Sequence, residues 1–73
     1  MGTYEVKAEV TGSVWKIVAA VGQEVEPGGT IVIVESMKME IPVVAEDGGR
    51  VEAIRVEEGA PVAEGQVVAV MAG

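Results

Sequence analysis

The stretch VESMKMEIP, residues 34–42, places a lysine between two methionines in a chain that has three lysines, no cysteine and no histidine. A strand buried on both faces would exclude the lysine, and turns are built from Gly, Pro, Asn, Asp and Ser rather than from methionine. The centre of this stretch therefore indicates a role other than folding. Its residues are Met37, Lys38 and Met39, with Glu35 and Glu40 just outside.

This stretch joins two copies of one motif. A shift of 37 residues aligns residues 1–36 with 38–73 without a gap, and Lys38 is matched only by Met1. Aligned glycines and β-branched residues at equal spacing indicate an internal repeat. Lys38 therefore belongs to the connection and not to the repeated scaffold. The identities are Val6/Val43, Ala8/Ala45, Glu9/Glu46, Gly12/Gly49, Val14/Val51, Ile17/Ile54, Gly22/Gly59, Val25/Val62 and Gly28/Gly65.

Each repeat is predicted to form short strands separated by turns. Residues 4–10 alternate between apolar and charged side chains, which is typical of a half-buried strand. Sixteen Val and five Ile favour strands, and no stretch of ten residues keeps helical spacing without a Gly or Pro. The sequence predicts an all-β fold of six to eight strands. The strand segments are residues 4–10, 13–18, 30–35, 41–45, 50–57, 61–62 and 66–71.

The two repeats are expected to pack together in a single domain, residues 1–73, because neither is large enough to bury its own apolar face. The result is a flattened barrel or sandwich about a pseudo-twofold axis. The aligned glycine pairs are expected at equivalent bends of positive φ. Trp15 lies on a strand and is expected to be a part-buried packing residue, with a binding platform as the alternative.

The connection between residues 35 and 40 leaves room only for a tight hairpin. With Met37 and Lys38 as its two central residues, Ser36 faces Met39 and the flanking glutamates face each other. Such hairpins favour Asn-Gly or Asp-Gly because positive φ is needed, so Met-Lys is poor turn chemistry. A lysine presented on this tip suits modification by another protein, although a solvated turn lysine is the plainer alternative.

Composition excludes several classes of function. A net charge of −7 repels phosphate backbones, so nucleic-acid binding is not expected. Without Cys or His, no thiol chemistry, common metal cluster or Ser-His catalytic set is available. No apolar run reaches the roughly 20 residues of a membrane helix, and no signal peptide is recognised at the start of the sequence. We therefore expect a cytoplasmic protein without membrane association.

Three segments resemble the biotinyl domains of biotin-dependent carboxylases: ESMKME, the preceding VGQEVEPGGTIVIVE, and the following GGRVEAIRVEEGAPVAEGQVVAV. The resemblance covers essentially the whole chain and is closest to a stand-alone biotin/lipoyl attachment domain. It implies the hammerhead-like biotinyl/lipoyl fold, a flattened β-barrel of two four-stranded antiparallel sheets. It also implies that a biotin protein ligase joins biotin to Lys38 through an amide bond, with Met37 and Met39 as flanking recognition residues. Glu35 and Glu40 are either ligase contacts or a solvated acidic rim.

The function that this resemblance implies is that of a non-catalytic, monomeric carrier. Such domains move carboxybiotin from a biotin carboxylase to a carboxyltransferase. Ser36 departs from the family, whose commonest residue before Met-Lys-Met is Ala, and Glu35-Ser36 is similar to the entry of lipoyl hairpins. A lipoyl carrier modified on the same lysine is therefore the first alternative, and an unmodified β-barrel interaction module is the second.

Overall fold

Eight strands and no helix make up residues 2–73, which are the residues that the computed structural model describes. The prediction of an all-β fold is confirmed. Met1, the first residue of the predicted repeat and the counterpart of Lys38, lies outside the described residues. The strands are β1 (Thr3–Lys7), β2 (Gly12–Ile17), β3 (Glu24–Val25), β4 (Gly29–Ser36), β5 (Met39–Ala45), β6 (Gly49–Ile54), β7 (Pro61–Val62) and β8 (Val67–Ala72).

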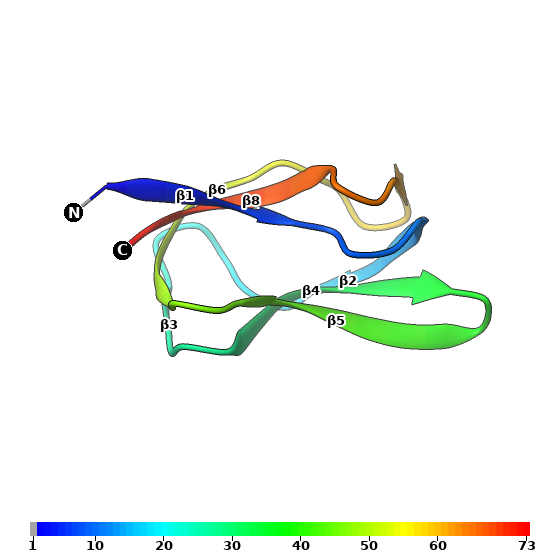
Figure 1. Ribbon diagram of the computed structural model, residues 1–73, viewed down its shortest axis with the longest axis horizontal. Helices are drawn as coiled ribbons and strands as arrows, with labels where there is room; N and C mark the ends of the chain where they lie inside the picture. Colours follow the sequence, from blue (N-terminus) through cyan, green and yellow to red (C-terminus); the bar gives the residue numbers. More distant parts are fainter. Residues whose placement is uncertain (1) are drawn as a thin grey trace.

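The strands form two four-stranded sheets in which all pairs are antiparallel. The first sheet has the order β1-β8-β6-β3, and the second has the order β5-β4-β2-β7. Figure 1 shows the two sheets as facing layers of an elongated molecule, with extents of 36 × 17 × 17 Å. The predicted sandwich of two antiparallel sheets is confirmed.

Strand pairing repeats with the same 37-residue shift as the sequence. The pairs Ser13↔Glu35 and Val14↔Val34 in the second sheet correspond to Arg50↔Ala72 and Val51↔Met71 in the first. Even the irregularities recur, because one residue is unpaired at the same point of each ladder, Trp15 in β2 and Glu52 in β6. The sequence repeat is therefore also a repeat of backbone geometry, as the pseudo-twofold arrangement requires.

The core between the sheets is aliphatic and draws on both repeats. The alternation predicted for residues 4–10 is present, since Val6 and Ala8 are buried while Glu5 and Lys7 are exposed. No charged or polar side chain is buried among the described residues. The buried residues are Val6, Ala8, Val14, Ala19, Ile31, Val32, Val34, Val43, Ala45, Val51, Val56, Val62, Val68, Ala69 and Met71.

The aligned glycines serve two different structural needs. Gly22, Gly28 and their counterparts Gly59 and Gly65 lie at positive φ, between 83° and 90°, as expected for turn glycines. The expectation is wrong for Gly12, whose φ is not in this region. A Cβ on Gly12 would instead overlap the backbone carbonyl of Glu35, so a glycine is needed there for close approach of β2 and β4.

Two local expectations also change. Glu24, which the sequence places in a turn between the predicted strands, pairs with Arg50 in the two-residue strand β3. A strand of two residues is too short to produce a recognisable sequence pattern. Trp15 is 49% exposed, more open to solvent than the packing role expected of it.

Replacement of Gly12 by alanine should destabilise the fold by about 1–3 kcal/mol, because the new methyl group forces β2 away from the backbone of β4. Urea or thermal unfolding measures the change. Gly2→Ala is the matched control, since no atom lies within 4 Å of a Cβ there. Equal stability of the two variants would contradict the close approach.

Candidate functional site

The β4–β5 hairpin ends in the two-residue turn that the sequence predicts. The last cross-strand pairs are Glu35↔Glu40 and Ser36↔Met39, which leaves Met37 and Lys38 as the central residues. Their φ angles are 52° and 65°, as a type I′ turn requires. In Figure 1 this hairpin forms one end of the long axis, opposite the chain termini.

Met37 and Lys38 are the sole non-glycine residues at positive φ within residues 2–73. Every other described residue in that region of backbone space is a glycine. A side chain in the left-handed conformation costs roughly 1–2 kcal/mol relative to glycine. The turn thus keeps two side chains at a position where folding alone favours glycine, which points to a function for those side chains.

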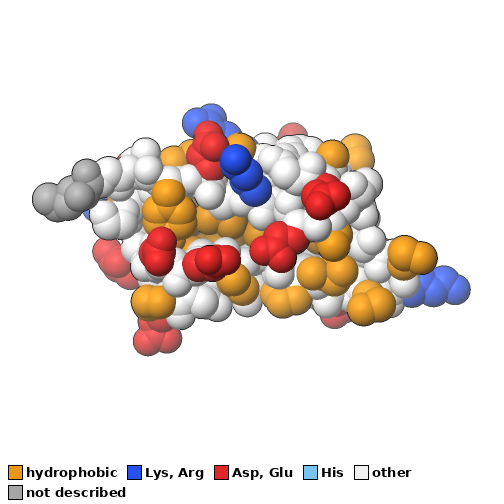
Figure 2. Space-filling view, viewed as in Figure 1, with side chains coloured by type: hydrophobic (Ala, Val, Ile, Leu, Met, Phe, Trp, Pro, Cys, Tyr) orange, Lys and Arg blue, Asp and Glu red, His pale blue; other side chains and the backbone are white. Residues whose placement is uncertain are grey.

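The tip presents apolar side chains around a lysine. Met37 is 92% exposed and Met39 62% exposed, and Lys38 is also exposed. Figure 2 shows basic and hydrophobic side chains projecting together at the end of the molecule where Figure 1 places this hairpin. No hydrogen bond or ion pair found among the described residues engages the Nζ atom of Lys38.

Sequence reasoning missed the contact that holds the root of the hairpin. The hydroxyl of Ser36 donates a hydrogen bond of 2.8 Å to the backbone carbonyl of Thr11, on the connection between β1 and β2. The hydroxyl oxygen of Thr11 in turn accepts the backbone N–H of Glu64 at 3.1 Å. The departure at Ser36 from the usual biotinyl alanine was the available signal. Ser36 therefore joins the hairpin root to Thr11, and Thr11 separately contacts the second repeat through Glu64.

All five predicted site residues lie together at this end. Glu35 and Glu40 are exposed and directly opposite each other on adjacent strands, so the predicted like-charge pair is present. Chemically, the tip offers one accessible primary amine on a backbone that is fixed by its strand ladder. No group of three His, Cys, Asp or Glu residues able to hold a metal ion occurs in the described part of the chain.

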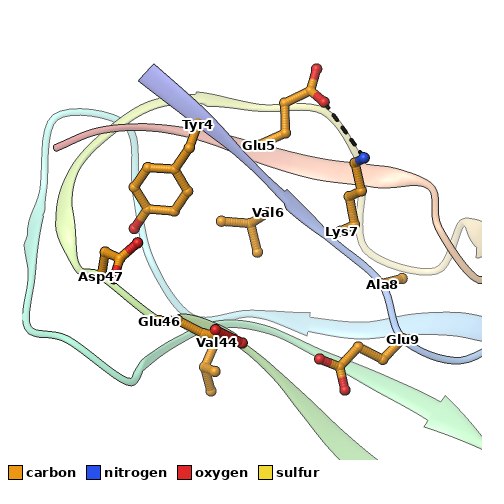
Figure 3. Close-up of a pocket in the computed structure, with 9 residues that line it drawn as sticks. All are labelled: Tyr4, Glu5, Val6, Lys7, Ala8, Glu9, Val44, Glu46 and Asp47. Carbon is orange, nitrogen blue, oxygen red and sulfur yellow. Dashed lines mark ion pairs between the residues drawn. The ribbon is translucent and has the colours of Figure 1, made fainter. Parts of the chain in front are cut away.

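A shallow hollow between the edge strands β1 and β5 is separate from the tip (Figure 3). Its walls carry Glu5, Glu9 and Glu46 around an apolar floor. At one end the hydroxyl of Tyr4 donates a hydrogen bond to the carbonyl of Gly48. Burial, followed by the nearby Asp47 carboxylate, raises the pKa of Tyr4 above its ordinary value. None of the residues from Glu35 to Glu40 lines this hollow.

Comparison with known proteins places the chain among attachment domains. The family model described as "Biotin-requiring enzyme" matches residues 3–71. The "Biotin/lipoyl attachment protein" of Bacillus subtilis is 41% identical over 63 residues, which cover 86% of each chain. The "Biotinylated protein TB7.3 homolog" of Mycobacterium leprae is 39% identical over 67 residues, 92% of this chain and 94% of that protein.

A solved structure gives the same result for the fold. The urea carboxylase of Kluyveromyces lactis contains a region that superposes on 99% of this chain with a TM-score of 0.93 and 40% sequence identity. The superposed region is 6% of that much longer protein. Within residues 2–73, no helix is long and apolar enough to cross a membrane.

Lys38→Gly should stabilise the fold by about 1 kcal/mol, because it removes a side chain from a left-handed backbone position. The same replacement at Lys16, within β2, should destabilise it by roughly 0.5–1 kcal/mol, since glycine weakens a strand. Chemical denaturation of both variants provides the measurement. A loss of stability at position 38 would show that its side chain contributes to folding.

Proposed function

The chain belongs to the biotin/lipoyl family, and from that premise we propose that it is a biotin carrier whose covalent attachment site is Lys38. The observation that carries this proposal is the turn itself. An accessible amine stands at an exposed two-residue tip, held there at a backbone position that would suit glycine better. Covalent attachment requires only such an amine, and so the residues present fit the group.

The attachment step needs an enzyme. Lys38 is exposed, whereas a lysine that acts as an enzymatic nucleophile is typically desolvated in an apolar pocket or placed next to another cation. A biotin protein ligase would supply biotinyl-adenylate and provide the groups or water that accept the released protons. The Nζ atom forms an amide bond with the acyl carbon, the acyl–phosphate bond breaks, AMP leaves, and the original ammonium releases two protons.

Met37 and Met39 are proposed as the residues that the ligase contacts around the amine. Both thioethers are exposed, and methionine is flexible enough to fit an apolar surface on a partner. Burying them on a partner recovers apolar surface that the isolated domain leaves in water. Glu35 and Glu40 flank them and are proposed to meet cationic groups of the ligase.

The carrier role follows from the geometry of the arm. Lysine with the biotin side chain forms a tether of roughly 10 to 14 Å, and the rigid strand ladder fixes its base. When bound, biotin supplies a ring nitrogen that carries a carboxyl group. Tethering raises the local concentration of that group at partner sites without any new contact. The proposed partners are a biotin carboxylase and a carboxyltransferase, with the domain itself monomeric and non-catalytic.

Lipoate on the same lysine is not favoured. The Mycobacterium leprae relative is named for biotinylation, and the matching family description also names biotin. The lipoyl-like feature at Ser36 has a structural explanation, because its hydroxyl anchors the hairpin root. The cytoplasmic location remains a prediction from the sequence.

Co-expression with a biotin protein ligase should increase the intact mass by one biotinyl group, and Lys38→Arg should abolish the increase. Arginine keeps the charge and the length but cannot form the amide under these conditions. Lys7→Arg and Lys16→Arg are the matched controls and should be modified fully. Modification at either of those lysines, or an unchanged mass with active ligase, would refute the assignment.

Glu35→Gln with Glu40→Gln should raise the KM of ligation several-fold while leaving kcat nearly unchanged, since loss of charge complementarity mainly weakens association. Steady-state incorporation of labelled biotin measures both constants. Glu24→Gln with Glu26→Gln makes the same charge change at exposed sites on and beside β3. If the two double variants behave alike, the glutamate pair is only a solvated rim.

A further inference from the structure

The two repeats provide an internal comparison of their outer faces. Each position in the first repeat has a counterpart 37 residues later, with the same strand pairing. The first sheet carries both ion pairs found in the described residues. Lys7 lies 4.0 Å from Glu5 on β1, and Arg50 lies 3.0 Å from Glu52 on β6. This face is a solvated, charged surface.

The corresponding positions on the second sheet carry no charge. Counterparts of the β1 pair are Pro42 and Val44, and counterparts of the β6 pair are Ser13 and Trp15. Arg55, which follows β6, has Val18 as its counterpart. Five charged residues on the first sheet, or directly after it, thus have uncharged and mostly apolar counterparts on the second sheet.

Folding does not require this apolar character. Trp15 is the unpaired residue of the β2 irregularity and is 49% exposed, while Glu52 occupies the same backbone position in β6. Val18 is 47% exposed where the other repeat has an arginine. The same backbone accepts Glu and Arg at these points. Exposed apolar residues that the fold does not need are typical of an interaction surface.

The name Trp15 patch is used here for Trp15, Val18, Ile33 and Pro42, which lie on or next to the adjacent strands β2, β4 and β5 and are exposed or partly exposed. Ile33 pairs with Pro42 on one side and with Lys16 on the other. It lies between the buried Val32 and Val34, so the alternation of the strand turns its side chain outward.

The patch belongs to the sheet that carries the hairpin. Trp15 follows Val14, which pairs with Val34, and Lys38 is four positions after Val34 in the sequence. At about 3.4 Å per residue, the patch begins about 14 Å from the modified lysine. The edges nearest the hairpin are acidic, because Glu35 lies opposite Ser13 and Glu40 lies opposite Glu35.

A further carboxylate limits the patch along β2. The Oε2 atom of Glu58 accepts the backbone N–H of Ile17 at 3.0 Å, next to Val18. Lys16, which is exposed and pairs with Ile33, adds one cation to this otherwise apolar face. The complementary occupant is therefore a mainly apolar protein surface with cationic groups facing Glu35, Glu40 and Glu58.

We propose that the Trp15 patch is a docking surface for the ligase that modifies Lys38, an inference that rests on the proposed function. An unmodified lysine reaches only about 6 Å from its Cα atom, so the ligase must cover the tip closely. A standard interface buries about 800 Å² on each partner, which corresponds to a radius of about 16 Å and extends to Trp15. Tryptophan is among the residues most often found at the energetic centre of such interfaces.

Truncation at the two equivalent positions tests the proposal. Trp15→Ala should lower kcat/KM for biotin incorporation by about tenfold or more, mainly through KM, as expected for loss of an interface tryptophan. Glu52→Ala, at the corresponding site of the other sheet, should leave kcat/KM within about twofold. Pro42→Ala should lower kcat/KM by a smaller factor. Because Pro42 lies on β5, this second test is independent of any effect that the loss of Trp15 has on the folding of β2. Amide NMR spectra and unfolding midpoints establish that each variant is folded.

The protein has a single tryptophan, which allows direct observation of binding. With 5-fluorotryptophan incorporated, ligase and biotin without ATP should shift or broaden the single fluorine resonance and reduce its H₂O/D₂O solvent shift. Perturbation of the Lys38 amide signal in the same sample shows that the ligase is bound.

Each outcome separates this proposal from the carrier assignment. A perturbed Lys38 amide with an unchanged fluorine signal and an unchanged kcat/KM for Trp15→Ala overturns the patch but leaves the carrier function intact. Absence of biotin on Lys38 in every variant overturns the carrier function. Self-association of the purified protein that Trp15→Ala abolishes, with normal ligation, assigns the patch to another molecule of this protein and overturns docking of the ligase.

Discussion

The backbone of the β4–β5 turn is the constraint on which the site depends. From the pair Val32↔Val43 onward, pairing is regular up to Ser36 and Met39, so two residues must reverse the chain, and both adopt positive φ. This conformation turns Lys38 away from the core and fixes its Cα atom relative to the sheet. Its side chain is exposed, while the strand pairs on either side of the turn hold its backbone. An attachment residue needs this combination, since the searching motion then belongs to the arm and not to the fold.

The duplicated scaffold explains how a chain this short supports such a strained tip. Val14 and Val34 from the first repeat and Val51 and Met71 from the second occupy equivalent places in one aliphatic core. Because that core is dense and contains no polar side chain, it offsets the cost of two left-handed residues at a distance. At the other pole, the backbone N–H of Gly73 donates a 3.1 Å hydrogen bond to the carbonyl of Gly2.

Much of this arrangement was accessible from the sequence. The repeat and the alternation of residues such as Val6 and Ala8 were enough to predict the fold, because a strand with one buried face alternates apolar and polar residues along the sequence. The register of the hairpin followed from its length alone. The role of Gly12 could not be predicted from the sequence. A glycine that is needed where two strands approach closely looks the same in a sequence as a glycine that is needed in a turn. The Ser36–Thr11 contact was also missed, because it joins residues 25 apart in sequence.

Internal symmetry separates what the fold requires from what function adds. Where both repeats keep the same residue, as at Val14 and Val51, the demand is structural, and both side chains are buried. Where the repeats differ at exposed positions, as at Trp15 and Glu52, the same backbone geometry occurs with either residue. At Trp15 and Val18, the apolar member of the pair lies on the sheet that ends in Lys38. An apolar surface and an exposed amine on one side of a symmetric scaffold are what a partner needs to distinguish one end and one face of the molecule from its near-duplicate.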